Sequence, residues 1–190
     1  MISISCRNNG VTKEFQEGIT LQEALKHFEF DQPYRIVSAK VNNVSQGLRF
    51  RVYNNRDVEF VDIRDASGMR VYDRSLSFLL YKATIEIFPE AKIRMEHPIS
   101  NGCYCSLLKP DRSKVCPEDV ERIKERMWEL VKEDVAFHRR EVNIDKAIDI
   151  FRASNQDDKV KLLETSGEVY MDYYLLGDTP DYYYGRLVPS

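Results

Sequence analysis

A short helix signal lies directly behind a hairpin signal at the start of the chain, and this order restricts the fold more than any other feature. Thr20 to Glu23 form a capping box, since the threonine hydroxyl can accept from the third helical N–H while the glutamate reaches back. Ahead of it, Ile2 to Cys6 alternate apolar with polar residues, and Asn8-Asn9-Gly10 predicts a turn into Val11–Phe15. We therefore expect a β-hairpin followed by a capped helix.

Further strand patterns complete a first unit over residues 1–65. Arg35–Val41 and Asp57–Ile63 are rich in apolar and β-branched residues, and Asn42-Asn43 predicts a turn between them. A hairpin, a helix and then more strands are the pattern of a ubiquitin-like β-grasp domain. The polar stretch Asp65–Gly68 is the expected boundary.

A second α+β unit is expected over residues 69–190. Its first helix should begin near Arg74 and end at Pro89, and Pro117 suits the first position of a long helix. A hairpin is expected around Ser100-Asn101-Gly102. The remaining predicted elements are strands at 93–97, 103–108, 137–142 and 169–176 and helices at 145–153 and 157–164.

Composition excludes some functional classes. The 190 residues contain no apolar run of the roughly 20 residues that a membrane helix needs, and the first ten residues do not resemble a signal peptide, so a cytoplasmic protein is expected. The net charge of −3 argues against strong overall attraction to nucleic acid. Arg49, Arg51 and Arg56 could form a local basic patch, although a solvated surface is the simpler interpretation.

Several short motifs resemble known domains. Ser38-Ala39-Lys40-Val41-Asn42 is similar to a strand end of the TGS module, the β-grasp domain that opens threonyl-tRNA synthetases. The second unit resembles the domain with which those synthetases edit mischarged tRNA. The matching segments of this unit are Pro98–Tyr104, Pro117–Met127, Asp158–Val160 and Gly185–Pro189.

The chain departs from that family at the editing site. The family joins H-x-x-x-H on the first helix to C-x-x-x-H near the end, and these positions align with Arg74, Phe78, Tyr183 and Leu187. Arginine, phenylalanine and leucine have no lone pair for a metal, so we expect no metal ligand, no zinc and no catalytic residue here.

Two polar residues keep the family's identity. Lys159 and Asp181 match a lysine and an aspartate near the family's editing pocket. With the four replaced positions they define an expected ligand cleft of six residues: Arg74, Phe78, Lys159, Asp181, Tyr183 and Leu187. The alternative is that Lys159 and Asp181 are ordinary polar surface residues.

A second resemblance favours a kinase. The tail Leu176–Ser190 resembles that of uridine-kinase-like nucleoside kinases, in which a TGS module and a synthetase-like domain precede a P-loop kinase. This resemblance implies a non-catalytic regulatory region, a kinase domain after Ser190 as its partner, and ATP and Mg²⁺ as cofactors of the whole protein. The chain itself has no G-x-x-x-x-G-K-[ST] motif. An oligomer and a nucleotide or RNA ligand are compatible with this reading.

Two rival functions stay open. The chain could be an RNA- or tRNA-binding module derived from a threonyl-tRNA synthetase, or a hydrolase of aminoacyl esters that the lost ligands disfavour.

The cysteines and tyrosines give weaker signals. Cys103 and Cys105 should share one strand face, near His97 in sequence, but Cys-x-Cys is a weak zinc signal and strand packing is the preferred explanation. The tyrosines between Tyr170 and Tyr184 are better explained by packing than by base stacking.

Overall fold

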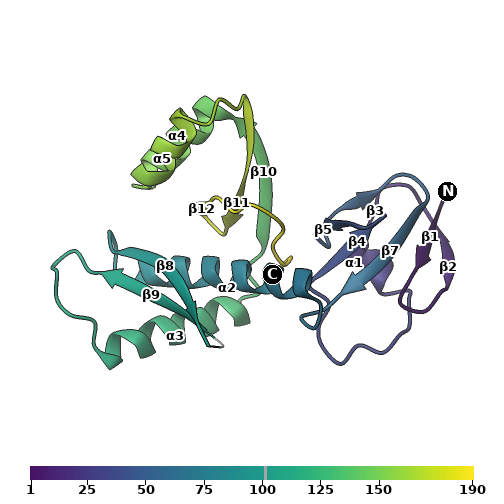
Figure 1. Cartoon of the computed structure of the whole chain (residues 1–190), viewed down its shortest axis with the longest axis horizontal. Helices are drawn as coiled ribbons and strands as arrows, with labels where there is room; N and C mark the ends of the chain where they lie inside the picture. The colour runs from purple at the N-terminus through teal and green to yellow at the C-terminus, as the bar shows by residue number, and fades with distance from the viewer. Residues whose placement is uncertain (101) are drawn as a thin grey trace. The chain divides into compact units, whose positions relative to one another are not determined.

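The chain has an α+β fold that divides into two compact units (Figure 1). The computed structural model describes residues 1–100 and 102–190, so the Asn101 part of the predicted turn lies outside the described residues. The first unit comprises residues 1–75 and 184–189, and the second comprises residues 76–183 and 190. The domains expected from the sequence, 1–65 and 69–190, stay a prediction. Among the described residues, no helix is both long and apolar enough to cross a membrane.

The first unit contains a five-stranded sheet and a short helix. Its elements are β1 (Ile2–Cys6), β2 (Thr12–Phe15), β3 (Ile19–Thr20), α1 (Leu21–Leu25), β4 (Ser38–Val41), β5 (Val44–Gln46), β6 (Arg51–Val52) and β7 (Arg56–Val61). The sheet has the order β2-β1-β7-β4-β5, in which β1 and β7 are parallel and the other neighbours antiparallel. β3 and β6 form a separate two-stranded sheet.

The local signals of this unit are confirmed. The Thr20 hydroxyl accepts from the Glu23 N–H at 3.2 Å, and the Glu23 carboxylate accepts from the Thr20 N–H at 2.9 Å. Asn42 and Asn43 have φ angles of 47° and 67° and turn the chain from β4 into β5, a strand that was not expected. Apolar side chains of the sheet and of α1 form one core, of which Ile4 is fully buried.

The helix α2 (Ala66–Ile87) begins earlier than the sequence predicts. The Asp65 carboxylate accepts from the Ser67 N–H at 2.7 Å, and the Asp65 carbonyl accepts from the Met69 N–H at 2.9 Å. Both contacts satisfy N–H groups of a first helical turn. Gly68 does not interrupt the helix. Glycine is needed there for close packing, because a Cβ at this position would lie 2.0 Å from the Asp62 carbonyl oxygen. The start near Arg74 is therefore wrong, because the polar stretch caps the helix.

The second unit continues from residue 76 of α2. Its other elements are β8 (Lys92–Ile99), β9 (Gly102–Leu108), α3 (Pro117–Lys132), β10 (Phe137–Asn143), α4 (Ile144–Ala153), α5 (Asp157–Glu164), β11 (Tyr170–Leu176) and β12 (Thr179–Asp181). β8 and β9 form an antiparallel hairpin, and β10, β11 and β12 form an antiparallel sheet beside which α4 and α5 lie (Figure 1). Apart from the start of α2, the predicted helices and long strands are confirmed within a few residues.

Apolar side chains of α2, α3 and β9 form a small core in this unit. Ala83, Ile123 and Leu130 are buried in it, and Leu107 packs against them. The Lys109 ammonium fixes the segment after β9 to α3 through the Asp119 carboxylate, at 2.7 Å. This interaction lowers the pKa of Asp119 to about 2, with a second contribution from the Cys116 N–H.

Candidate functional site

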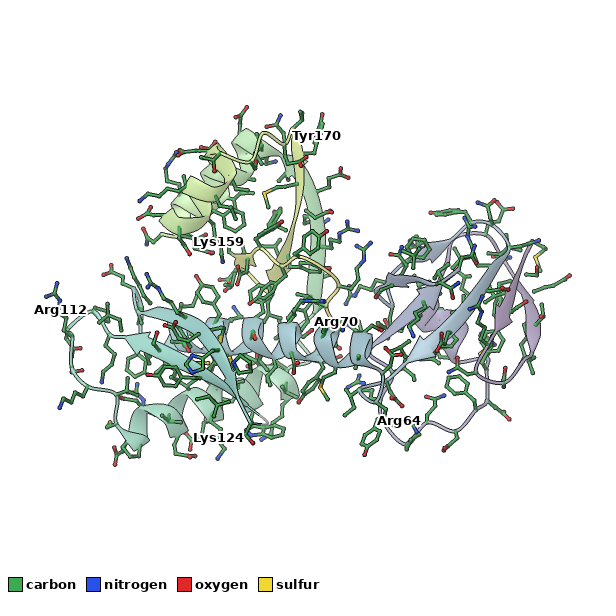
Figure 2. The ribbon with its side chains drawn as sticks, viewed as in Figure 1. Arg64, Arg70, Arg112, Lys124, Lys159 and Tyr170 are labelled. Atoms are coloured by element: carbon green, nitrogen blue, oxygen red, sulfur yellow. The ribbon has the colours of Figure 1, made fainter. Side chains whose placement is uncertain are left out.

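A buried ion pair joins the two polar residues that the resemblance singled out. Lys159 projects from α5 (Figure 2), and its ammonium donates to the Asp181 carboxylate at the end of β12. Only 6% of the Asp181 side chain and 22% of the Lys159 side chain are exposed. Gln156 accepts a second hydrogen bond from the ammonium at 2.5 Å, and its amide nitrogen donates to the Pro180 carbonyl at 2.8 Å. Lys159 therefore links Asp181 and Gln156 in one hydrogen-bonded network.

Aromatic rings surround this pair. The Lys159 ammonium lies 5.4 Å from the centre of the Tyr81 ring and 5.8 Å from that of Phe151, which suits cation–π attraction. The Tyr183 hydroxyl hydrogen-bonds to Asp181, and its ring centre lies 5.4 Å from that of Phe78. Phe78 is fully buried. The surroundings are apolar, so the charges are held in a region of low effective dielectric constant.

Burial controls the proton affinities in this cluster. It raises the pKa of Asp181, although the charge of Lys159 and the N–H of Tyr182 act in the opposite direction. It also raises the pKa of Tyr81 to about 12, with a further contribution from the Asp181 charge. The pKa of Tyr183 rises for the same two reasons, burial first. Both phenols are thus held neutral and can donate hydrogen bonds, while neither can act as a base near neutral pH.

A second buried lysine lies in the same unit. The Lys82 ammonium contacts the carboxylates of Glu86 and Asp178, each at 2.8 Å, and the Thr179 hydroxyl at 3.1 Å. Its side chain is only 5% exposed. These contacts tie the turn between β11 and β12 to α2, and so position the strand that carries Asp181.

The other two predicted cleft residues belong to the first unit. The Arg74 guanidinium donates to the Arg186 carbonyl at 3.0 Å. Gly185 has a φ of +126°, a backbone conformation that favours glycine, and a Cβ there would lie 2.7 Å from the arginine Nη1. Leu187 is buried. Arg74 therefore anchors the terminal segment of this unit.

The structure brings four of the six predicted residues together within the second unit: Phe78, Lys159, Asp181 and Tyr183. Sequence reasoning missed Gln156 and Tyr81, which complete the cluster. Gln156 lies three positions before Lys159, and Tyr81 lies three after Phe78, a spacing that places side chains on one helix face. Ligand binding by the six residues stays a prediction.

An exposed basic and aromatic segment lies in the first unit. The guanidinium of Arg51 donates to the Gly18 carbonyl at 2.8 Å, and that of Arg49 donates to the Pro189 carbonyl at 3.2 Å. Between and after these arginines, Phe50 and Tyr53 are 37% and 58% exposed. The segment thus combines positively charged guanidinium groups with exposed aromatic rings.

A pocket of about 380 Å³ in the same unit has the opposite character. Four carboxylates line it, from Asp31, Glu59, Asp62 and Asp65. Lys40 compensates part of this charge, since its ammonium donates to Asp65 at 2.7 Å and holds the pKa of that carboxyl well below its usual range. A phosphate is therefore not expected in this pocket.

Comparison with known proteins gives one consistent relationship. No family model matches the chain. It is 27% identical, over its whole length, to a threonine–tRNA ligase of Clostridioides difficile, and 30% identical, again over its whole length, to one of Carboxydothermus hydrogenoformans. A threonine–tRNA ligase of Marinobacter nauticus is 29% identical over 96% of the chain. The chain spans about 30% of the length of these relatives.

These matches overturn the kinase interpretation. The resemblance of the tail 176–190 to nucleoside kinases favours a regulatory region with a P-loop domain after Ser190, and this interpretation is wrong. The relatives are instead named threonine–tRNA ligases without exception. The tail 176–190 is too short to establish a relationship to kinases, whereas the similarity to the ligases extends over the whole chain.

Proposed function

We propose that this chain is an RNA-binding module derived from a threonyl-tRNA synthetase, and that it holds tRNA without hydrolysing it. Similarity along the whole chain to enzymes whose name includes tRNA is the observation that carries this proposal. The finer fold assignment belongs to the same proposal: the first unit is a TGS-like β-grasp domain and the second an editing-like domain. The mixed sheet of the first unit and its capped α1 support it.

The RNA surface that we propose is the segment Arg49–Arg56. It ends an acid-free stretch that begins at Gln32 and contains four arginines, Arg35, Arg49, Arg51 and Arg56, besides Lys40, which pairs with Asp65. A local field of this kind can attract phosphate although the chain as a whole is acidic. Its position in the first unit separates it in sequence from the ion pair of the second.

The geometry of this segment suits contacts with both the phosphate groups and the bases of RNA. Arg51 is held at the surface by the Gly18 carbonyl, so less side-chain entropy is lost when its planar group binds a phosphate. Tyr53 is also supported, because a Cβ on Gly18 would meet its ring at 3.4 Å. A supported, exposed ring is a platform on which an unpaired base can stack.

The second unit argues for holding over hydrolysis. Ester hydrolysis needs a placed base or a metal-bound water. Lys159 is a cation that donates to Asp181 and Gln156, and Tyr183 is held neutral by burial. Phe78 has no lone pair. The one carboxylate among them, Asp181, already accepts hydrogen bonds from Lys159, the Tyr182 N–H and the Tyr183 hydroxyl, so the cluster supports the strand end and does not activate water.

The test is a tRNA titration at several salt concentrations. The variant Arg49→Gln/Arg51→Gln/Arg56→Gln should bind at least about tenfold more weakly, and its salt slope should fall by about 2, since each lost phosphate contact removes roughly 0.7 to 0.9. The control removes three exposed charges of the second unit, Lys124→Gln/Arg152→Gln/Lys161→Gln, and should bind as the parent does.

Two outcomes would overturn the proposal. Equal losses in both variants would show that only total charge matters, and no measurable binding at about 50 mM salt would remove RNA as the ligand. Turnover of mischarged tRNA that disappears in Asp181→Asn would contradict the statement that the module does not hydrolyse.

A further inference from the structure

Three sulfur atoms gather on one face of the β8–β9 hairpin. Cys103 and Cys105 are two residues apart on β9, so their side chains point to the same face. Met95 is the direct cross-strand partner of Cys105, and its sulfur lies 3.2 Å from the cysteine Sγ. Cys103 is the next residue along this face, and the Cys105 Sγ lies 3.6 Å from its carbonyl oxygen.

A bulge in β8 removes the imidazole from this group. The register changes between Met95 and His97, so that His97 lies opposite Tyr104 instead of opposite Cys103. The ring centres of His97 and Tyr104 are 5.5 Å apart. Because Tyr104 alternates with the two cysteines along β9, His97 faces away from the sulfur atoms.

Solvent can reach all three residues. Cys103 is exposed, Cys105 is half-buried, and Met95 is 37% exposed. Among the described residues, the thiols make long contacts with oxygen, from Cys103 to the Tyr104 carbonyl and from Cys105 to the Cys103 carbonyl, each at 3.6 Å. Weak hydrogen bonds of this kind do not compete with a metal–thiolate bond.

We propose that Cys103, Cys105 and Met95 bind one monovalent copper ion. Two thiolates and a thioether are soft ligands, and this set selects Cu(I) over harder ions. On binding, each thiol releases its proton to solvent as its sulfur bonds the metal, and the thioether adds its lone pair without losing a proton. The copper stays in the +1 state throughout, so no electron is transferred.

The same geometry disfavours zinc. Structural zinc is bound by four ligands in a tetrahedron, and His97 is the nearest further nitrogen in sequence but faces the other side. Within residues 1–100 and 102–190, no cluster of three or more histidine, cysteine or acidic side chains could hold a metal ion. Three sulfur atoms alone suit an ion that accepts low coordination numbers.

The experiment is an anaerobic titration of the reduced, full chain with Cu(I) in competition with a chromophoric Cu(I) chelator. One equivalent should bind tightly. Cys103→Ser and Cys105→Ser should each abolish tight binding. Met95→Leu, which preserves volume, should weaken it at least about tenfold, since loss of a ligand should cost no less than loss of an outer-shell partner. Cys116→Ser is the control, because that exposed thiol is the N-cap residue before α3 and should not contribute.

The result can also contradict the proposal clearly. If Met95→Leu and Cys105→Ser bind copper as the parent does, or if uptake disappears in Cys116→Ser, the site is not on this hairpin. Stoichiometric Zn²⁺ binding that survives a competing chelator would show that the choice of a soft ion is wrong. Circular dichroism of each variant separates loss of binding from loss of fold.

Discussion

Lys159→Met tests the buried ion pair directly. Methionine keeps most of the apolar stem but removes the ammonium, and so leaves the Asp181 carboxylate, which is only 6% exposed, with the Tyr182 N–H and the Tyr183 hydroxyl. Removal of one partner from a buried pair typically costs about 3 to 5 kcal/mol. Because Lys159 is itself 22% exposed and two hydrogen bonds to Asp181 persist, we expect about 3 kcal/mol at pH 7.5.

The loss should depend on pH in a defined direction. Burial raises the pKa of Asp181 in the folded chain, and removal of the neighbouring cation should raise it further. A carboxyl group whose folded pKa is raised binds more protons when folded, so its stabilising contribution is largest below the unfolded value of about 4 and is lost as pH rises toward the folded value. The destabilisation by Lys159→Met should therefore be smaller at pH 5 than at pH 7.5.

Urea unfolding of four chains at both pH values measures this effect. The double variant Lys159→Met/Asp181→Asn removes the stranded charge and should be more stable than Lys159→Met alone. Lys161→Met, on the exposed side of the same helix, should change stability little. A cost below about 1 kcal/mol for Lys159→Met, or a double variant no more stable than the single one, would refute the argument that Asp181 depends on this cation.

Three further changes test other parts of the fold. Gly68→Ala should destabilise the first unit by at least about 2 kcal/mol in urea unfolding, because the added Cβ would lie 2.0 Å from a main-chain oxygen; this clash outweighs the helix preference of alanine. Gly47→Ala is the control and should be tolerated, since a Cβ there meets nothing nearer than 3.7 Å. Thr20→Ala should cost about 1 kcal/mol in the same assay through loss of the cap. Asp119→Asn should remove stability that the parent has above about pH 4 and loses as the pH falls toward about 2, because the Lys109 contact lowers the pKa of Asp119 in the folded chain. Acid unfolding curves of the parent and the variant that do not differ in this way would contradict the prediction.

Local signals were sufficient for much of the fold. The capping box at Thr20 and the helix Asp157–Glu164 depend on neighbours within four residues, so sequence spacing predicts them well. The strands β3, β6 and β12 are two or three residues long, too short for a periodic pattern. The parallel pairing of β1 with β7 joins residues about fifty positions apart, so local residue spacing does not predict it.

The candidate site was predictable only in part. The resemblance identified Lys159 and Asp181 as a matching pair, but not that they bind each other, because that depends on the turn that Lys82 fixes and on burial. The sulfur cluster was underestimated for a related reason. Spacing puts Cys103 and Cys105 on one face, whereas the approach of Met95 and the departure of His97 follow from a bulge that the sequence does not announce.

The packing of Phe78 restricts which residues can replace it. Its ring centre lies 5.7 Å from that of Phe137 and 5.4 Å from that of Tyr183, and the residue has no exposed surface. A histidine introduced at position 78 alone would place a polar ring among these rings without a partner, which costs free energy and offers no activity in return. Position 183 is restricted in the same way, because cysteine there would leave a cavity. Either substitution alone would therefore lower stability, so metal ligands could be accommodated at positions 78 and 183 only if the neighbouring rings changed with them.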